Sequence, residues 1–134
     1  MSGDPVLAKI AEDARGASYS ILLPDGQEIV LIRTNKGYWR GGHSHNVDEV
    51  SVLLSGSAQY RKRTTDRILG EVEVDFIQEV GGVLKNAPGE PHAALALEDY
   101  WLIDMRPGSK ADQVKNTNYP PWRKLVDEQL GGKA

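Results

Sequence analysis

Two histidines and a glutamate lie close together in a stretch of strand-forming residues. The segment 37–56 reads GYWRGGHSHNVDEVSVLLSG, with His43 and His45 two residues apart and Glu49 four residues further on. Side chains two residues apart point to the same face of an extended chain, and Glu49 shares that face if the strand continues through the polar residues 46–48. Because two imidazoles and a carboxylate on one face are typical ligands of a divalent transition metal, the sequence predicts a metal site here.

His92 completes the set of three histidines in the sequence. It follows the turn-forming segment PGEP at 88–91 and begins a strand-like run, HAALAL. A single histidine on a strand is more often a surface or structural residue than a ligand. The joint pattern with His43, His45 and Glu49 nevertheless favours one site that uses all three histidines.

The spacing of this first segment resembles the first conserved motif of the cupin superfamily at every defined position. The matching residues are Gly37, His43, His45, Glu49 and Gly56. The second cupin motif is matched less completely, by Gly82, Pro88, Gly89 and His92. Its proline lies one residue nearer the histidine than usual, and Ala96 stands where an asparagine is expected.

The resemblance implies an all-β double-stranded β-helix, the cupin or jelly-roll barrel, which is often a homodimer. It also implies one divalent metal ion near the barrel axis, held by His43, His45, Glu49 and His92. Three imidazoles and one carboxylate leave about two open positions on a six-coordinate ion. Fe, Mn, Ni, Zn and Cu all suit these ligands.

The elements that must position these residues are short. Glycine- and proline-rich turns separate many short strand-like segments over about residues 18–106, a pattern typical of a sandwich or barrel. Apolar residues with helical spacing after Asp4 and Pro5 predict a short N-terminal helix at about residues 5–14. Residues 107–119 are polar and show no pattern, and a second helix is expected at about 121–130. We expect a single domain, 1–134, with a helix near each end of an all-β core.

Strand alternation also predicts which side chains line the site. Ser51 shares the face of Glu49, and Tyr60, on the next strand, can enter the same pocket. Arg40 shares the face of His43 only if the intervening pair Gly41-Gly42 forms a bulge. Tyr60 and Arg40 are therefore the candidate catalytic residues, because a tyrosine or arginine beside a metal can hold a substrate oxygen.

Composition limits the classes of partner. With 16 basic and 19 acidic side chains the formal net charge is -3, which gives no reason to expect nucleic acid or an anionic membrane as a partner. The chain has no cysteine, so disulfides and thiolate zinc sites are excluded. No stretch reads as a signal peptide or membrane span, so we expect a cytoplasmic protein that acts on a small molecule.

Three functions fit these residues. The favoured one is a metal-dependent cupin enzyme, a dioxygenase, isomerase or lyase acting on a small polar metabolite. The segment 40–45, RGGHSH, also resembles the RGxHxH stretch of metal-free sugar-nucleotide 3,4-ketoisomerases, in which the histidine pair moves protons. The third is a non-catalytic metal- or ligand-binding module.

Overall fold

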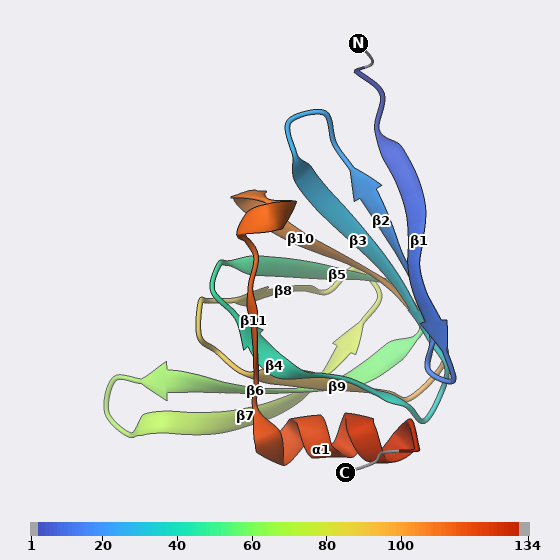
Figure 1. Ribbon diagram of the computed structural model, residues 1–134. Coiled ribbons are helices and arrows are strands. Elements are labelled where there is room, and N and C mark those ends of the chain that lie inside the picture. Colours follow the sequence, from blue (N-terminus) through green and yellow to red (C-terminus); the bar gives the residue numbers. More distant parts are fainter. Residues whose placement is uncertain (1–2, 132–134) are drawn as a thin grey trace.

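The computed structural model describes residues 3–131, which form two antiparallel sheets and a helix near the C-terminus (Figure 1). The six-stranded sheet has the order β1 (Val6–Asp13), β2 (Gly16–Leu22), β3 (Gln27–Thr34), β10 (Tyr100–Lys110), β5 (Glu49–Ser55) and β8 (Val83–Asn86). The five-stranded sheet has the order β11 (Asn116–Asn118), β4 (Trp39–His45), β9 (His92–Ala96), β6 (Ser57–Asp66) and β7 (Gly70–Glu79). A short 3-10 helix, η1 (Ala111–Gln113), links β10 to β11. The all-β, jelly-roll class predicted from the sequence is confirmed.

The inner face of β5 shows how the fold positions the site. Glu49, Ser51 and Leu53 alternate with more exposed residues and are all buried, as expected for a strand with one face toward the interior. The hydrophobic cluster around Leu53 contains Ala58, Tyr60, Ala94, Ala96, Tyr100 and Leu102. One face of a single strand therefore carries, in order, a predicted metal ligand, a hydroxyl and a core leucine.

Gly56 allows the tight reversal between β5 and β6. Its φ is 83°, in the region that favours glycine, and a Cβ at this position would lie 2.1 Å from the carbonyl oxygen of Asp99. No other residue fits between these two backbones. The backbone geometry therefore explains why the first motif ends in a glycine, Gly56.

The N-terminal helix predicted at about residues 5–14 is wrong. The segment forms strand β1, which pairs antiparallel with β2 from Val6 opposite Leu22 to Asp13 opposite Gly16. Its eight residues are all exposed, so the apolar side chains with helical spacing do not pack on a core. Pairing of its backbone with the edge of β2 determines the conformation and overrides the local pattern.

The C-terminal helix predicted at about 121–130 is present as α1 (Pro120–Gln129). Prolines occupy its first positions, and it lies against β4 on the outer side of the five-stranded sheet (Figure 1). Trp122 and Val126 are its buried residues. Neither helix in residues 3–131 is long and apolar enough to cross a membrane. The predicted domain, 1–134, also includes residues 1–2 and 132–134, which lie outside the described range, and remains a prediction.

Candidate metal centre

The three histidines converge between two neighbouring strands. His43 and His45 lie on β4, and His92 begins β9, where its Cα is the register partner of His43. The ring centroids are 4.7 to 5.1 Å apart, and one nitrogen of each ring lies within 4.8 Å of the others. Strand pairing therefore brings together residues that are almost fifty positions apart in the sequence.

Glu49 joins this cluster from the other sheet. Its Oε2 lies 2.9 Å from His45 Nε2, and its Oε1 lies 3.2 Å from His92 Nε2. Asn86 Nδ2 donates a hydrogen bond to Oε1 at 3.1 Å, and Arg106 Nη2 donates one to Oε2 at 3.2 Å. The structure thus brings together the four residues that the sequence singled out as ligands, and it adds two donors that hold the carboxylate.

Two hydrogen bonds select the histidine tautomers. His45 Nδ1 lies 2.6 Å from Asn116 Oδ1, and His92 Nδ1 lies 3.2 Å from the carbonyl oxygen of Glu90. Both oxygens are acceptors, so the proton of each neutral ring resides on Nδ1 and the lone pair on Nε2. Metal-binding histidines commonly show this arrangement, because the outer hydrogen bond orients the ring and leaves the other nitrogen available.

The inner nitrogen of His45 fits a cation. His45 Nε2 is buried and has no hydrogen-bond partner within residues 3–131, although Glu49 Oε2 is only 2.9 Å away. A lone pair that faces a carboxylate oxygen is unfavourable unless positive charge lies between them. Three imidazoles and one carboxylate are also the donor types that divalent transition metals prefer. These residues therefore fit such an ion.

The protonation states of the cluster's side chains also suit metal binding. Burial lowers the pKa of His43 to about 3, with further lowering by the charges of His92 and His45. Burial also lowers the pKa of His92. For Glu49, burial alone would raise the pKa, but the contact with His45 and the charges of His92, His45 and Arg106 outweigh it, and the pKa is about 2. At neutral pH His43 and His92 are thus neutral and Glu49 is ionised, the forms in which these groups bind metals.

A glycine bulge shapes the approach to the site. The register between β4 and β9 shifts between Gly41 and His43, and Gly41 and Gly42 have φ values of 90° and 76°. A Cβ on Gly42 would lie 2.6 Å from the backbone of Arg123 in α1. Only glycine permits this contact, and the bulge turns Arg40 toward the same cavity as the histidines.

The histidines and Glu49 line a cavity of about 200 Å³. Arg40 and Tyr60, the candidate catalytic residues, line it too. The Tyr60 ring stacks on His92 with centroids 6.2 Å apart, and its hydroxyl accepts a hydrogen bond from Asn86. Burial raises the pKa of Tyr60 well above its ordinary value, so its hydroxyl keeps its proton at neutral pH. The catalytic roles of Arg40 and Tyr60 remain predictions.

Sequence reasoning missed several polar residues of the cavity. Asn86, Asp104 and Arg106 line or support it from β8 and β10, and Asn116 from β11. Asp104 and Arg106 share the inward alternation of Leu102, which was the available signal. Asn116 gave none, because it lies in the polar segment that showed no pattern.

No protein-family model matches the sequence, and no curated protein does. Solved structures do match. CapF, the capsular polysaccharide assembling protein of Staphylococcus aureus, has a TM-score of 0.67 and 19% identity, over 84% of this chain and 32% of its own. Oxalate decarboxylase of Bacillus subtilis has a TM-score of 0.63 and 19% identity, over 94% and 35%. The 7S globulin of Momordica charantia has a TM-score of 0.69 and 10% identity, over 84% and 35%. The chain spans about a third of the length of these proteins, and at such identities the likeness is one of fold.

Proposed function

We propose that this chain, which has the fold of the cupin superfamily, binds one divalent transition metal at His43, His45, Glu49 and His92. We further propose that it is a metal-dependent enzyme acting on a small polar metabolite by dioxygenase, isomerase or lyase chemistry. The observation that carries the proposal is the buried Nε2 of His45. It has no hydrogen-bond partner among the described residues and faces Glu49, while the contact with Asn116 selects the tautomer of the ring.

The bound ion would act as a Lewis acid toward substrate oxygens, or as a redox centre if it is iron. The chain supplies the rest of the site. Arg106 and Asn86 donate hydrogen bonds to Glu49 and hold its carboxylate in place. Manganese, which the Bacillus subtilis oxalate decarboxylase contains as Mn(II) centres, is one candidate beside Fe, Ni, Zn and Cu.

Two contacts of Tyr60 support a role in holding the ligands rather than in moving a proton. Asn86 Nδ2 donates both to the Tyr60 hydroxyl and to Glu49 Oε1, so the tyrosine orients the amide that orients the carboxylate. Its ring also packs on His92. We therefore propose that Tyr60 is a positioning residue for two of the four ligands.

A metal-free ketoisomerase is the second candidate, because Arg40 lines the same cavity as His43 and His45. Under that hypothesis His45 and Glu49 would share a proton, and His92 would have no part in the chemistry. A non-catalytic binding module is the third candidate. The homodimer expected for this fold and the cytoplasmic location remain predictions.

Metal content tests the proposal. Protein purified without affinity nickel or added metal is expected to contain close to one ion per chain, and His45→Ala and Glu49→Ala are expected to lose it. Glu71→Ala, which removes an exposed carboxylate of β7, serves as the control and should keep the metal. Metal far below one ion per chain, unchanged in the two site variants, would contradict the proposal and favour the ketoisomerase.

Oxygen consumption then separates the reaction classes. A dioxygenase consumes oxygen together with its substrate, whereas turnover under strict anoxia indicates an isomerase or lyase. A metal-loaded protein that turns over no member of a broad metabolite set, but is stabilised by one of them, would support the binding module instead.

A further inference from the structure

We propose that the cavity binds a compact oxyanion, a carboxylate or a phosphate group, held by the guanidinium of Arg40 beside the polar side chains of Ser51 and Asp104. The inference rests on the proposed function, because it names the substrate class of the same site. It goes beyond that function in assigning the anion-binding residues.

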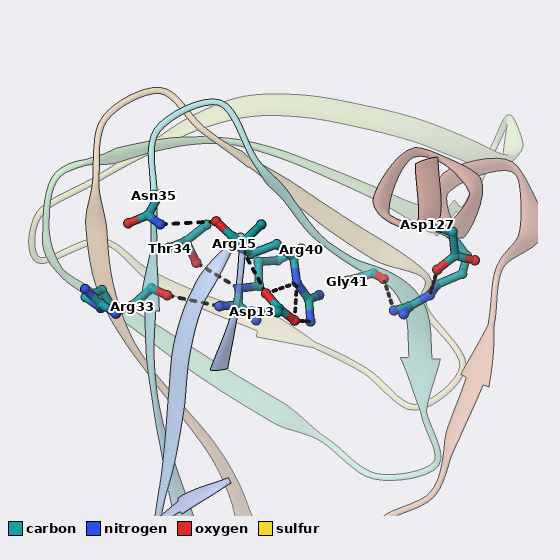
Figure 2. Close-up of polar contacts among 10 residues, drawn as sticks. Asp13, Arg15, Arg33, Thr34, Asn35, Arg40, Gly41 and Asp127 are labelled. Carbon is teal, nitrogen blue, oxygen red and sulfur yellow. Dashed lines mark hydrogen bonds and ion pairs between the residues drawn. The ribbon is translucent and has the colours of Figure 1, made fainter. Parts of the chain in front are cut away.

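Arg40 is a half-buried positive charge without a carboxylate partner in the part of the chain that the structure describes. Its Nε donates to Thr34 Oγ1 at 2.9 Å, and its Nη2 donates to the carbonyl oxygen of Arg33 at 3.0 Å (Figure 2). Both acceptors are neutral, and Arg40 forms no ion pair within residues 3–131. A guanidinium has five N–H donors and stays charged in proteins, so donors remain for a ligand that supplies the missing negative charge.

The other three arginines of the cavity all have carboxylate partners. Arg15 forms a forked contact with Asp13 at 2.8 to 3.2 Å (Figure 2). Arg106 contacts Glu49, and Arg123 contacts Asp127 at 3.1 Å. Arg40 is the exception among the four. Asp13 lies near Arg40, but both of its oxygens are engaged by Arg15.

Ser51 and Asp104 add two polar groups with unmet hydrogen-bonding capacity. They are register partners on β5 and β10, and both line the cavity. Ser51 Oγ is buried without a partner in the described part of the chain, and Asp104 forms no hydrogen bond or ion pair there. Buried polar groups in proteins are nearly always bonded, so groups left open in a cavity indicate where a ligand binds.

The charge of Asp104 does not oppose an anion. Burial raises the pKa of this carboxyl well above its ordinary value, and the negative charge of Glu49 raises it further. The raised pKa favours the neutral, protonated form of Asp104, and that form can donate a hydrogen bond to a ligand oxygen. Arg40 therefore brings a positive charge to the cavity that no ion pair within residues 3–131 offsets, although the chain as a whole has a formal charge of -3.

The volume limits the size of the ligand. At about 200 Å³ the cavity is smaller than the pockets of about 300–1,000 Å³ that enclose drug-sized molecules. A planar guanidinium matches the two oxygens of a carboxylate or phosphate. A compact oxyanion therefore fits both the volume of the cavity and the geometry of the guanidinium.

Calorimetric titration of the chelator-treated, metal-free chain and of the metal-loaded chain tests the proposal. The probes are malonate, inorganic phosphate and malonamide, which is the neutral analogue of malonate. We expect malonate or phosphate to bind and malonamide not to bind, with the two anions distinguishing a carboxylate site from a phosphate site. Arg40→Gln should weaken anion binding by about tenfold or more, and Arg40→Lys should have a smaller effect.

Arg33→Gln is the matched control. It removes the same charge from β3, in the other sheet, where the side chain is 39% exposed, and should leave the affinity unchanged. Ser51→Ala, which changes no charge, should weaken binding and provides a second test if Arg40→Gln does not fold. Equal affinity of Arg40→Gln and the unmodified chain, or binding of malonamide as tight as malonate, would overturn the inference.

Metal content measured on the same preparations separates the two proposals. A metal-loaded chain that binds no anion overturns the anion site and leaves the metal site intact. A chain that holds no metal as purified and takes up none on loading, but binds malonate through Arg40, supports the anion site and overturns the metal-dependent function.

Discussion

Replacing Asn116 with alanine is expected to weaken metal binding, although Asn116 is not itself a ligand. The substitution removes the oxygen that accepts the Nδ1 proton of His45 at 2.6 Å. Without it, the ring can rotate or adopt the other tautomer, which places a proton on the nitrogen that faces the metal position. The expected loss is therefore specific to affinity for the metal and should leave the number of sites unchanged.

The size of the effect follows from the place of Asn116. Loss of an outer hydrogen bond to a metal-binding histidine reduces metal affinity by about 10–100-fold, or about 1.4–2.7 kcal/mol. Asn116 is an exposed residue on β11, so water can partly replace its oxygen. We expect a loss of about tenfold, at the lower end of that range. Asn116→Asp should have the opposite sign, because a carboxylate accepts the same proton in a stronger, charge-assisted bond.

Competition with a chromogenic chelator for Zn(II) or Mn(II) measures these affinities. Asn118→Ala is the matched control, because Asn118 lies on the same strand, is exposed, and pairs with the neighbouring ligand His43 through the backbone alone. Equal affinities of Asn116→Ala and Asn118→Ala would refute the reasoning. So would an Asn116→Asp variant that binds metal as weakly as the alanine variant.

Three further predictions concern stability. Gly42→Ala should destabilise the chain by about 2 kcal/mol or more in chemical denaturation and lower metal affinity. Gly70→Ala is the control, because Gly70 has a φ of 79° but open space at Cβ. Its loss of stability should be smaller, since it comes from backbone strain alone. The metal-free chain should lose stability as the pH falls from about 7 to about 5. In this range the unfolded state binds a proton at His43, whereas the folded state, in which the pKa of His43 is about 3, does not. Chemical denaturation at the two pH values should show a smaller stability difference for His43→Gln than for the unmodified chain. Asp104→Asn should raise the melting temperature more at about pH 8 than at about pH 4. The reason is that the folded state retains a proton on Asp104 that the unfolded state releases as the pH rises. An equal rise in melting temperature at both pH values would contradict this prediction.

The four predicted ligands could be recognised because their positions depend on local rules. His43, His45 and Glu49 lie within one segment, where alternation along an extended chain determines the face of each side chain. His92 followed from the small number of histidines and from the turn that precedes it. The inward alternation on β5 likewise placed Ser51 correctly on the face of Glu49.

Elements that depend on distant pairing could not be recognised in this way. Residues 6–13 have helical apolar spacing, but β2 is the partner that determines their conformation, and no local pattern reveals that pairing. Residues 116–118 have no apolar alternation because β11 is an exposed edge strand held by its backbone contacts with β4. Pairing between segments far apart in the sequence outweighs local preference in both cases.

The same distinction separates the ligands from the groups that control them. Asn116 acts on His45 across 71 positions of the sequence, Arg106 acts on Glu49 across 57, and Asn86 acts on Glu49 across 37. The histidine–glutamate pattern determines where an ion would bind, whereas these distant residues determine the tautomer of one ligand and the charge of another. Metal affinity therefore depends on the strand order, which brings β8 and β10 beside β5 and brings β11 beside β4. A chain that kept the four ligands but lost these contacts would keep the donor atoms while losing the protonation states that metal binding requires.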